Sequence, residues 1–304
     1  MNTGQRRQFG PDPPLKAINM DLNTDIPTQP PRDAATLVLL RDGAQGLEVF
    51  LVRRHSASQV LGGAYVFPGG KLDAADATLH PGQLNLTPQA LHARLGEPET
   101  PVAKASALFV AALRETFEEA GVLLTETPHV LGARPPGGDF HALLADHGLR
   151  LNVAALQPWV RWITPRMPSV SSKRFDARFF VAAMPADQTA THDNLEATAS
   201  GWFRPDQALA QYWNGAMELA PPQIMSLAFL ARHRRVAGAL EDLAQRAPVA
   251  VLPESHDSGG QRVICYPGDP GHSVPIRALP GPTRLVWRNQ RFEPEGGLDA
   301  FWAD

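Results

Sequence analysis

Residues 114–121 read Arg-Glu-Thr-Phe-Glu-Glu-Ala-Gly and close the strongest helical pattern in the chain. Small or apolar residues recur before and within it at three- and four-residue spacing, at Ala105, Leu108, Phe109, Ala112, Leu113, Thr116, Phe117 and Ala120. This spacing predicts a helix over Ala103–Ala120 with one buried stripe. Gly121 follows directly, as glycine commonly does where a helix ends.

Three glutamates lie on this predicted helix. Because successive residues turn by about 100°, Glu115, Glu118 and Glu119 project from neighbouring positions at the border of the apolar stripe. Carboxylates packed together near a protein wall repel one another, and a divalent cation such as Mg²⁺ or Mn²⁺ removes the conflict. The alternative is a solvated helix face in which Arg114 pairs with Glu118.

A second segment carries a compatible signal. Ala64–Phe67 is a candidate strand that runs into Pro68-Gly69-Gly70, and Lys71-Leu-Asp-Ala-Ala-Asp76 follows. Paired glycines after a strand let the backbone approach a metal or a phosphate closely. Taken alone, this pair predicts only a turn.

The two segments together resemble the Nudix box: Gly, five residues, Glu, seven residues, then Arg-Glu-(apolar)-X-Glu-Glu-X-Gly-(apolar). Residues 114–122 match every fixed position of the second half, with Thr116 where an aliphatic residue is usual. The first half begins at Gly70, and Asp76 stands where the glutamate would be. Between Asp76 and Arg114 lie 37 residues rather than seven, so an insertion splits the box.

This split box is similar to that of the Nudix branch that contains the eukaryotic peroxisomal acyl-coenzyme A diphosphatases. Further likenesses are Trp162–Pro165 and Arg174–Phe180, and the similarity runs from about Ala35 to Trp213. The resemblance implies an α/β Nudix fold, in which a mixed β-sheet is sandwiched between helices. Here the fold would be enlarged by the insertion within the box and by a C-terminal extension.

The resemblance also implies roles for the box residues. Glu118 and Glu119 would bind Mg²⁺ or Mn²⁺ with the backbone carbonyl of Gly70. Glu115 would be a further ligand or would take the proton from the attacking water. Arg114 would orient the glutamates by hydrogen bonding, since its planar fork suits carboxylates.

Residues outside the core of the box complete the predicted site. Nudix sites often add a carboxylate from elsewhere, and Glu196 is the candidate here; the alternative is an exposed loop glutamate. Arg53, Arg54, Lys71 and Arg174 are the candidates for binding the phosphates of the substrate. For Arg53 and Arg54 the alternative is a basic strand end in solvent.

The remaining sequence predicts three regions. Residues 1–33 form an extended or disordered N-terminal segment, residues 34–248 form the Nudix domain with an insertion at about 77–101, and residues 249–304 form a β-rich extension packed on it. Within them we predict further strands and helices. The strands are Ala35–Leu40, Leu47–Val52, Val122–Leu124, Trp159–Thr164, Arg178–Ala183, Val263–Tyr266 and Thr283–Trp287; the helices are Pro88–Leu95, one from Pro205 and Pro221–Arg235.

Composition bounds the function. A net charge of −3 and a pI near 6.4 do not indicate the excess of basic residues that binding to long nucleic acid or to an anionic membrane requires. No stretch has the roughly 18 apolar residues of a membrane span, and the single cysteine, Cys265, excludes a disulfide framework and favours a cytoplasmic location. The resemblance, rather than the composition, implies a small-molecule diphosphate as the partner, and a homodimer is left open.

The predicted function is metal-dependent hydrolysis of a diphosphate bond in a nucleoside diphosphate derivative. The resemblance favours CoA or acyl-CoA, cleaved to 3′,5′-ADP and (acyl)phosphopantetheine. ADP-ribose or NADH is the alternative substrate, because the box does not recognise the leaving groups. A non-catalytic, Nudix-like binding or regulatory module is the alternative of another class, and the presence of all three glutamates argues against it.

Overall fold

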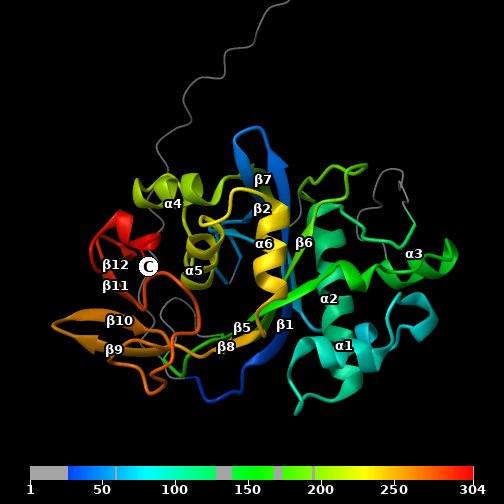
Figure 1. The fold of residues 1–304 in the computed structure, drawn as a ribbon, viewed down its shortest axis with the longest axis horizontal. Helices are drawn as coiled ribbons and strands as arrows, with labels where there is room; N and C mark the ends of the chain where they lie inside the picture. The colour runs from blue at the N-terminus through cyan, green and yellow to red at the C-terminus, as the bar shows by residue number, and fades with distance from the viewer. Residues whose placement is uncertain (1–26, 59, 128–138, 168–172, 194–195, 304) are drawn as a thin grey trace, which may run out of the picture.

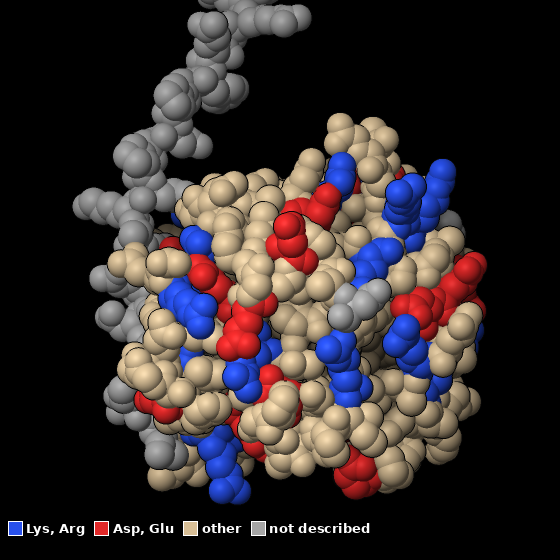
Figure 2. All heavy atoms as spheres, turned by 60° about the vertical axis from the view of Figure 1, so that its left-hand side comes forward, with Lys and Arg blue, Asp and Glu red and all other residues tan. Residues whose placement is uncertain are grey.

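The structure is a computed structural model that describes residues 27–58, 60–127, 139–167, 173–193 and 196–303. Most of the predicted N-terminal segment, residues 1–26, lies outside the described residues. The first strand, β1, begins at Arg32. Within the described residues, no helix is both long enough and apolar enough to cross a membrane. Lysine and arginine are interspersed with aspartate and glutamate over the face that Figure 2 shows.

A mixed eight-stranded sheet forms the centre of the molecule. Its strands are β1 (Arg32–Gly43), β2 (Gly46–Arg54), β3 (Tyr65–Val66), β4 (Gly69–Lys71), β5 (Gln157–Ile163), β6 (Phe175–Ala183), β7 (Ala197–Phe203) and β8 (Val249–Val251). The order is β3-β2-β1-β6-β5-β8, with β4 paired to β1 and β7 paired to β2. The pairs β1–β6 and β5–β8 are parallel, and the other pairs are antiparallel.

Helices cover both faces of this sheet (Figure 1). One face carries α1 (Pro88–Leu95), α2 (Val102–Ala120) and α3 (Phe140–Asp146); the other carries α4 (Pro205–Trp213), α5 (Pro221–Leu230) and α6 (Val236–Ala244). Alternation along β1 divides the core: Leu37 and Leu39 pack under α2, whereas Val38 and Leu40 pack under α4–α6. The predicted mixed sheet between helices is confirmed.

Helix α2 is the long helix that the apolar stripe predicts, starting one residue earlier. It begins after Pro101 and ends at Gly121, whose φ of 70° is the left-handed conformation of a C-terminal glycine. The inserted segment packs on it, since α1 buries Leu91 and Leu95 in the same core. Short 3₁₀ turns accompany these elements: η1 (Ala74–Ala77), η2 (Pro81–Gln83), η3 (Val153–Ala155) and η4 (Leu298–Phe301).

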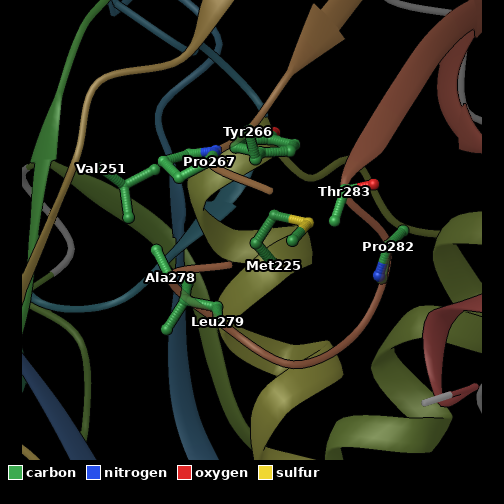
Figure 3. A pocket seen from close by; sticks show the side chains of 8 residues that line it. All are labelled: Met225, Val251, Tyr266, Pro267, Ala278, Leu279, Pro282 and Thr283. Carbon is green, nitrogen blue, oxygen red and sulfur yellow. The ribbon is translucent and has the colours of Figure 1, made fainter. Parts of the chain in front are cut away.

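A second sheet, of order β12-β11-β10-β9, lies beside α4 and α5 (Figure 1). Its strands are β9 (Glu254–Ser258), β10 (Gln261–Cys265), β11 (Arg284–Arg288) and β12 (Arg291–Pro294). The Tyr212 hydroxyl on α4 joins it to the main core, because it donates to the Phe292 carbonyl at 2.9 Å and accepts from the Phe292 amide at 2.8 Å. A cavity of about 10 Å³, the size of one water, remains where Met225 of α5 faces Tyr266 and Thr283 (Figure 3).

Two predicted elements are wrong in detail. Val122–Leu124 is buried but is not a strand, because the Gln188 side chain takes the place of a neighbouring strand: it bonds both the amide and the carbonyl of Leu123. Helix α5 ends at Leu230 rather than at Arg235. The carbonyl of Arg234 instead accepts a hydrogen bond from the Leu47 amide of β2, and α6 then begins at Val236.

Candidate active site

The two halves of the split motif meet in space. Strand β4 pairs with β1, placing Gly70 opposite Ala35, and η1 follows with Asp76. The side chain of Asp76 is fully buried and accepts two hydrogen bonds from Arg114, at 2.8 Å from Nε and 3.0 Å from Nη2. The insertion therefore begins after Asp76 and leads back to α2 without separating the two halves of the motif.

Arg114 connects the residues of the site. Its Nη1 donates to Glu115 at 2.8 Å and to Glu118 at 2.9 Å, and its Nη2 donates to the carbonyl of Lys71 at 3.0 Å. Burial lowers the pKa of Arg114, but the hydrogen bonds and charges of these carboxylates outweigh it and hold the pKa above its ordinary value. The arginine thus fixes the first half of the motif against the second.

Glu119 is the most buried of the three glutamates. Its Oε2 accepts a hydrogen bond from the Gly69 amide at 3.0 Å, and its Oε1 lies 3.8 Å from Nη1 of Arg54. Burial, and then the neighbouring charge of Glu115, raise its pKa to about 8. The Gly69 amide and Arg54 therefore stabilise the charged form of Glu119 by less than burial and Glu115 destabilise it.

Glu115 and Glu118 also have raised pKa values. Burial, with smaller contributions from the charges of Glu118 and Glu196, raises the pKa of Glu115 to about 7 despite the contact with Arg114. Burial likewise raises the pKa of Glu118. Glu196 is exposed, yet its charge acts on all three glutamates, so it lies on the same side of the domain.

Gly70 lies directly against Glu115. A Cβ atom built on Gly70 would come within 2.5 Å of the Glu115 carboxylate. Only a residue without a side chain allows this approach without displacing the glutamate. The backbone of the first half of the motif is therefore in contact with the carboxylates of the second half.

The donors suit a hard divalent cation. Oxygen ligands are what Mg²⁺ and Mn²⁺ prefer, and carboxylates with raised pKa values are those that a cation would stabilise in the charged form. Among the described residues, no three acidic, histidine or cysteine side chains converge as a ready-made metal cluster. Glu115 and Glu118 each use one carboxylate oxygen, Oε1 and Oε2 respectively, to accept a hydrogen bond from Arg114.

The predicted phosphate-binding residues lie at different places. Arg54 reaches the site through its contact with Glu119. Arg53 donates to the Gly63 carbonyl, and the exposed Lys71 contributes its carbonyl to Arg114. Arg174 donates twice to the carbonyl of Thr164, at the end of β5, and no contact joins it to the glutamates in the described parts of the chain.

The structure adds two residues to the neighbourhood of Arg114. In the sequence, Asp76 is noted only as standing in the place of the glutamate of the box, whereas the structure shows it as the buried partner of Arg114. His141, on α3, places Nε2 at 3.6 Å from Asp76, and within the described residues neither ring nitrogen has a hydrogen-bond partner. Its position depends on how α3 packs, so the sequence carried no signal for it.

The fold and this motif define the class. A crystal structure of a Nudix hydrolase from Alicyclobacillus acidocaldarius superposes with a TM-score of 0.57 at 28% identity, covering 70% of this chain and 97% of that one. The family model of the NUDT19 Nudix domain matches residues 30–230. The chain therefore belongs to the NUDT19 family of Nudix domains, which confirms the resemblance seen in the sequence.

Similar proteins include those called acyl-coenzyme A diphosphatase NUDT19. The Homo sapiens protein is 28% identical over 261 residues, covering 69% of each chain. The Gallus gallus protein is 29% identical over 64% of this chain and 67% of its own length. The Xenopus laevis protein is 26% identical over 60% of this chain, and the match spans 59% of its length.

Proposed function

We propose that this protein is a metal-dependent diphosphatase that hydrolyses CoA or acyl-CoA to 3′,5′-ADP and (acyl)phosphopantetheine. The observation that carries the proposal is the reassembled motif, in which Asp76 binds Arg114 and three glutamates gather around them. The names of the similar vertebrate proteins support acyl-CoA as the substrate class. ADP-ribose and NADH share the same type of bond and are the alternatives.

Each box residue has a proposed task. Glu118 and Glu119, with the Gly70 carbonyl, Glu115 and Glu196, would hold Mg²⁺ or Mn²⁺. When bound, such a cation neutralises the non-bridging phosphate oxygens and lowers the pKa of a coordinated water. Charge and position support this set, because Glu196 acts on all three helix glutamates and Gly70 lies against Glu115.

Glu115 is also the proposed acceptor of the proton from the attacking water. In the metal-free protein, burial raises its pKa to about 7, and a carboxylate in such an environment is suited to accept a proton. Arg114 would hold Glu115 and Glu118 in place, and Asp76 would hold Arg114. Arg54 is the best placed of the four predicted basic residues to contact a phosphate near Glu119.

The test is hydrolysis of a panel containing CoA, acetyl-CoA, longer acyl-CoAs, ADP-ribose and NADH, with Mg²⁺ or Mn²⁺ and product identification by mass spectrometry. Glu118→Gln is the active-site variant. Glu126→Gln is the matched control, because Glu126 is exposed and pairs with Arg150 on the surface. We expect 3′,5′-ADP from CoA compounds with wild type and the control, and none above background with Glu118→Gln.

The other outcomes are equally informative. AMP from ADP-ribose or NADH, without cleavage of CoA, would contradict the proposed substrate and keep the diphosphatase. Turnover that survives Glu118→Gln would contradict the proposed metal ligands. Absence of metal-dependent turnover across the panel would favour a non-catalytic binding module.

A further inference from the structure

A cluster of charged side chains lies on strands next to the candidate active site, because Arg178 of β6 and Gly70 of β4 both pair with Ala35 of β1. It consists of Asp33 at the start of β1, Glu97 at the end of the insertion, Arg161 on β5, and Asp176 and Arg178 on β6. Arg178 is its centre, with only 3% of its side chain exposed. We call this set the Arg178 cluster.

The contacts within the Arg178 cluster are close and directional. Arg178 donates to Glu97 at 3.0 Å from Nε and 2.7 Å from Nη2, and its Nη1 donates to Asp33 at 2.6 Å. Arg161 makes a two-point contact with Asp176 at 2.8 Å from each nitrogen and lies 3.1 Å from Glu97. The insertion is thereby fixed to three strands of the sheet immediately before α2 begins.

Asp33 connects this cluster to the first half of the box. Its backbone carbonyl accepts a hydrogen bond from the Leu72 amide at 3.0 Å. The carbonyl of the preceding residue, Lys71, accepts a hydrogen bond from Nη2 of Arg114 at 3.0 Å. A displacement of Asp33 is thus passed through two backbone contacts to the arginine that orients the glutamates.

The same aspartate connects to the second half of the box. Its Oδ2 lies 2.5 Å from Nζ of Lys104, which is in the first turn of α2. Arg178 also bonds Glu97, which precedes that helix by a few residues. The buried guanidinium of Arg178 therefore holds the segment before α2 directly, through Glu97. Through Asp33 it also holds α2, at Lys104, and the segment after β4, at Leu72.

We propose that Arg178 is a positioning residue that sets the spacing of the two halves of the split box, and so the affinity of the site for its cation. An unsplit box fixes this spacing through a short connection, whereas here 37 residues intervene and the connection imposes little constraint. Tertiary contacts must then supply it, and the contacts of Arg178 act in addition to the direct pairing of Arg114 with Asp76. A buried ion cluster suits this role because its geometry is specific even where its net stabilisation is small.

This inference rests on the proposed metal site, so its test measures binding directly. Mn²⁺ affinity is determined by electron paramagnetic resonance of free Mn²⁺, at a temperature where circular dichroism shows every variant folded. The variants are Arg178→Met and the milder Asp33→Asn, which leaves Arg178 paired with Glu97 and Asp176. Arg262→Met is the matched control, since Arg262 is also a buried, ion-paired arginine but lies on β10 of the second sheet.

We expect Arg178→Met to bind Mn²⁺ about tenfold more weakly than wild type, the size of effect seen when residues supporting metal ligands are removed. Asp33→Asn should weaken binding in the same direction. Arg262→Met should lower the melting temperature and leave the affinity unchanged, because Arg262 lies on β10 of the second sheet and pairs with Asp257 there. Partial recovery of affinity in Arg178→Lys would add support.

Affinities equal to wild type in both Arg178→Met and Asp33→Asn would overturn the inference. If Arg178→Met does not fold, unchanged affinity in Asp33→Asn alone would overturn it. Mn²⁺ binding by a wild type that hydrolyses nothing on the panel would contradict the proposed activity while these affinities still decide the positioning role. A wild type that binds no Mn²⁺ would overturn both.

Discussion

Replacing Glu119 by glutamine should make the metal-free protein more stable. Burial and the charge of Glu115 raise the pKa of Glu119 from its ordinary value of 4.5 to about 8, and its side chain is 6% exposed. Glutamine has nearly the same volume and keeps an oxygen acceptor for the Gly69 amide. It cannot ionise, so it removes the cost of a buried charge.

The size and the pH dependence of this gain follow from the pKa. Below about pH 4.5 the carboxyl group is protonated in both folded and unfolded chains, and Glu119 has no effect. As pH rises toward 8, the unfolded chain releases the proton and the folded chain holds it, so wild-type stability falls by about 1.4 kcal/mol per pH unit. The expected gain for Glu119→Gln is roughly 3 kcal/mol at pH 7 and on the order of 5 kcal/mol at pH 9.

The assay is thermal unfolding in EDTA at about pH 5, 7 and 9, where 3 kcal/mol corresponds to a rise in melting temperature of about 6 °C. Glu126→Gln, at an exposed site, is the control and should change little. Adding Mn²⁺ should stabilise wild type more than Glu119→Gln, reversing the order. A variant that is less stable than wild type in EDTA at every pH, or a gain independent of pH, would refute the reasoning.

Two substitutions separate stability from metal binding. Asp76→Asn removes one charge of a buried, two-point pair with Arg114, and should cost about 3 kcal/mol and lower the melting temperature by about 6 °C; an unchanged melting temperature would contradict this. Gly70→Ala places a Cβ 2.5 Å from the Glu115 carboxylate, the movable end of a flexible side chain. It should shift the melting temperature by less than about 2 °C yet weaken Mn²⁺ binding about tenfold, and equal affinity in a Mn²⁺ titration would contradict it.

Local pattern was sufficient to predict the elements that carry the motif. Apolar residues recur with the 3.6-residue period of a helix over residues 102–120, and the next residue, Gly121, is the glycine at which the helix ends. Strands β1 and β2 likewise follow from the apolar runs predicted as strands at Ala35–Leu40 and Leu47–Val52. These signals depend on residues a few positions apart, so they can be recognised without knowing what packs against them.

The pattern at Val122–Leu124 shows the limit of such signals. The run is apolar and buried, as predicted, but the amide and carbonyl of Leu123 bond the side chain of Gln188, 65 residues away, and the carbonyl of Leu124 accepts from the Asn152 amide. Burial follows from residue type, whereas strand pairing requires a second strand at the right place. The sequence therefore predicted the environment and not the hydrogen-bond partner.

Residue types and their local spacing were enough to predict the chemistry of the candidate site: three glutamates and an arginine at fixed spacing on one helix, and a glycine pair after a strand. The folded chain was needed to show that Asp76 binds Arg114 across the insertion, that His141 lies beside that pair, and that Arg178 fixes the insertion to the sheet. Spacing along one helix is fixed by helix geometry, while a contact across 37 residues depends on how the whole chain packs.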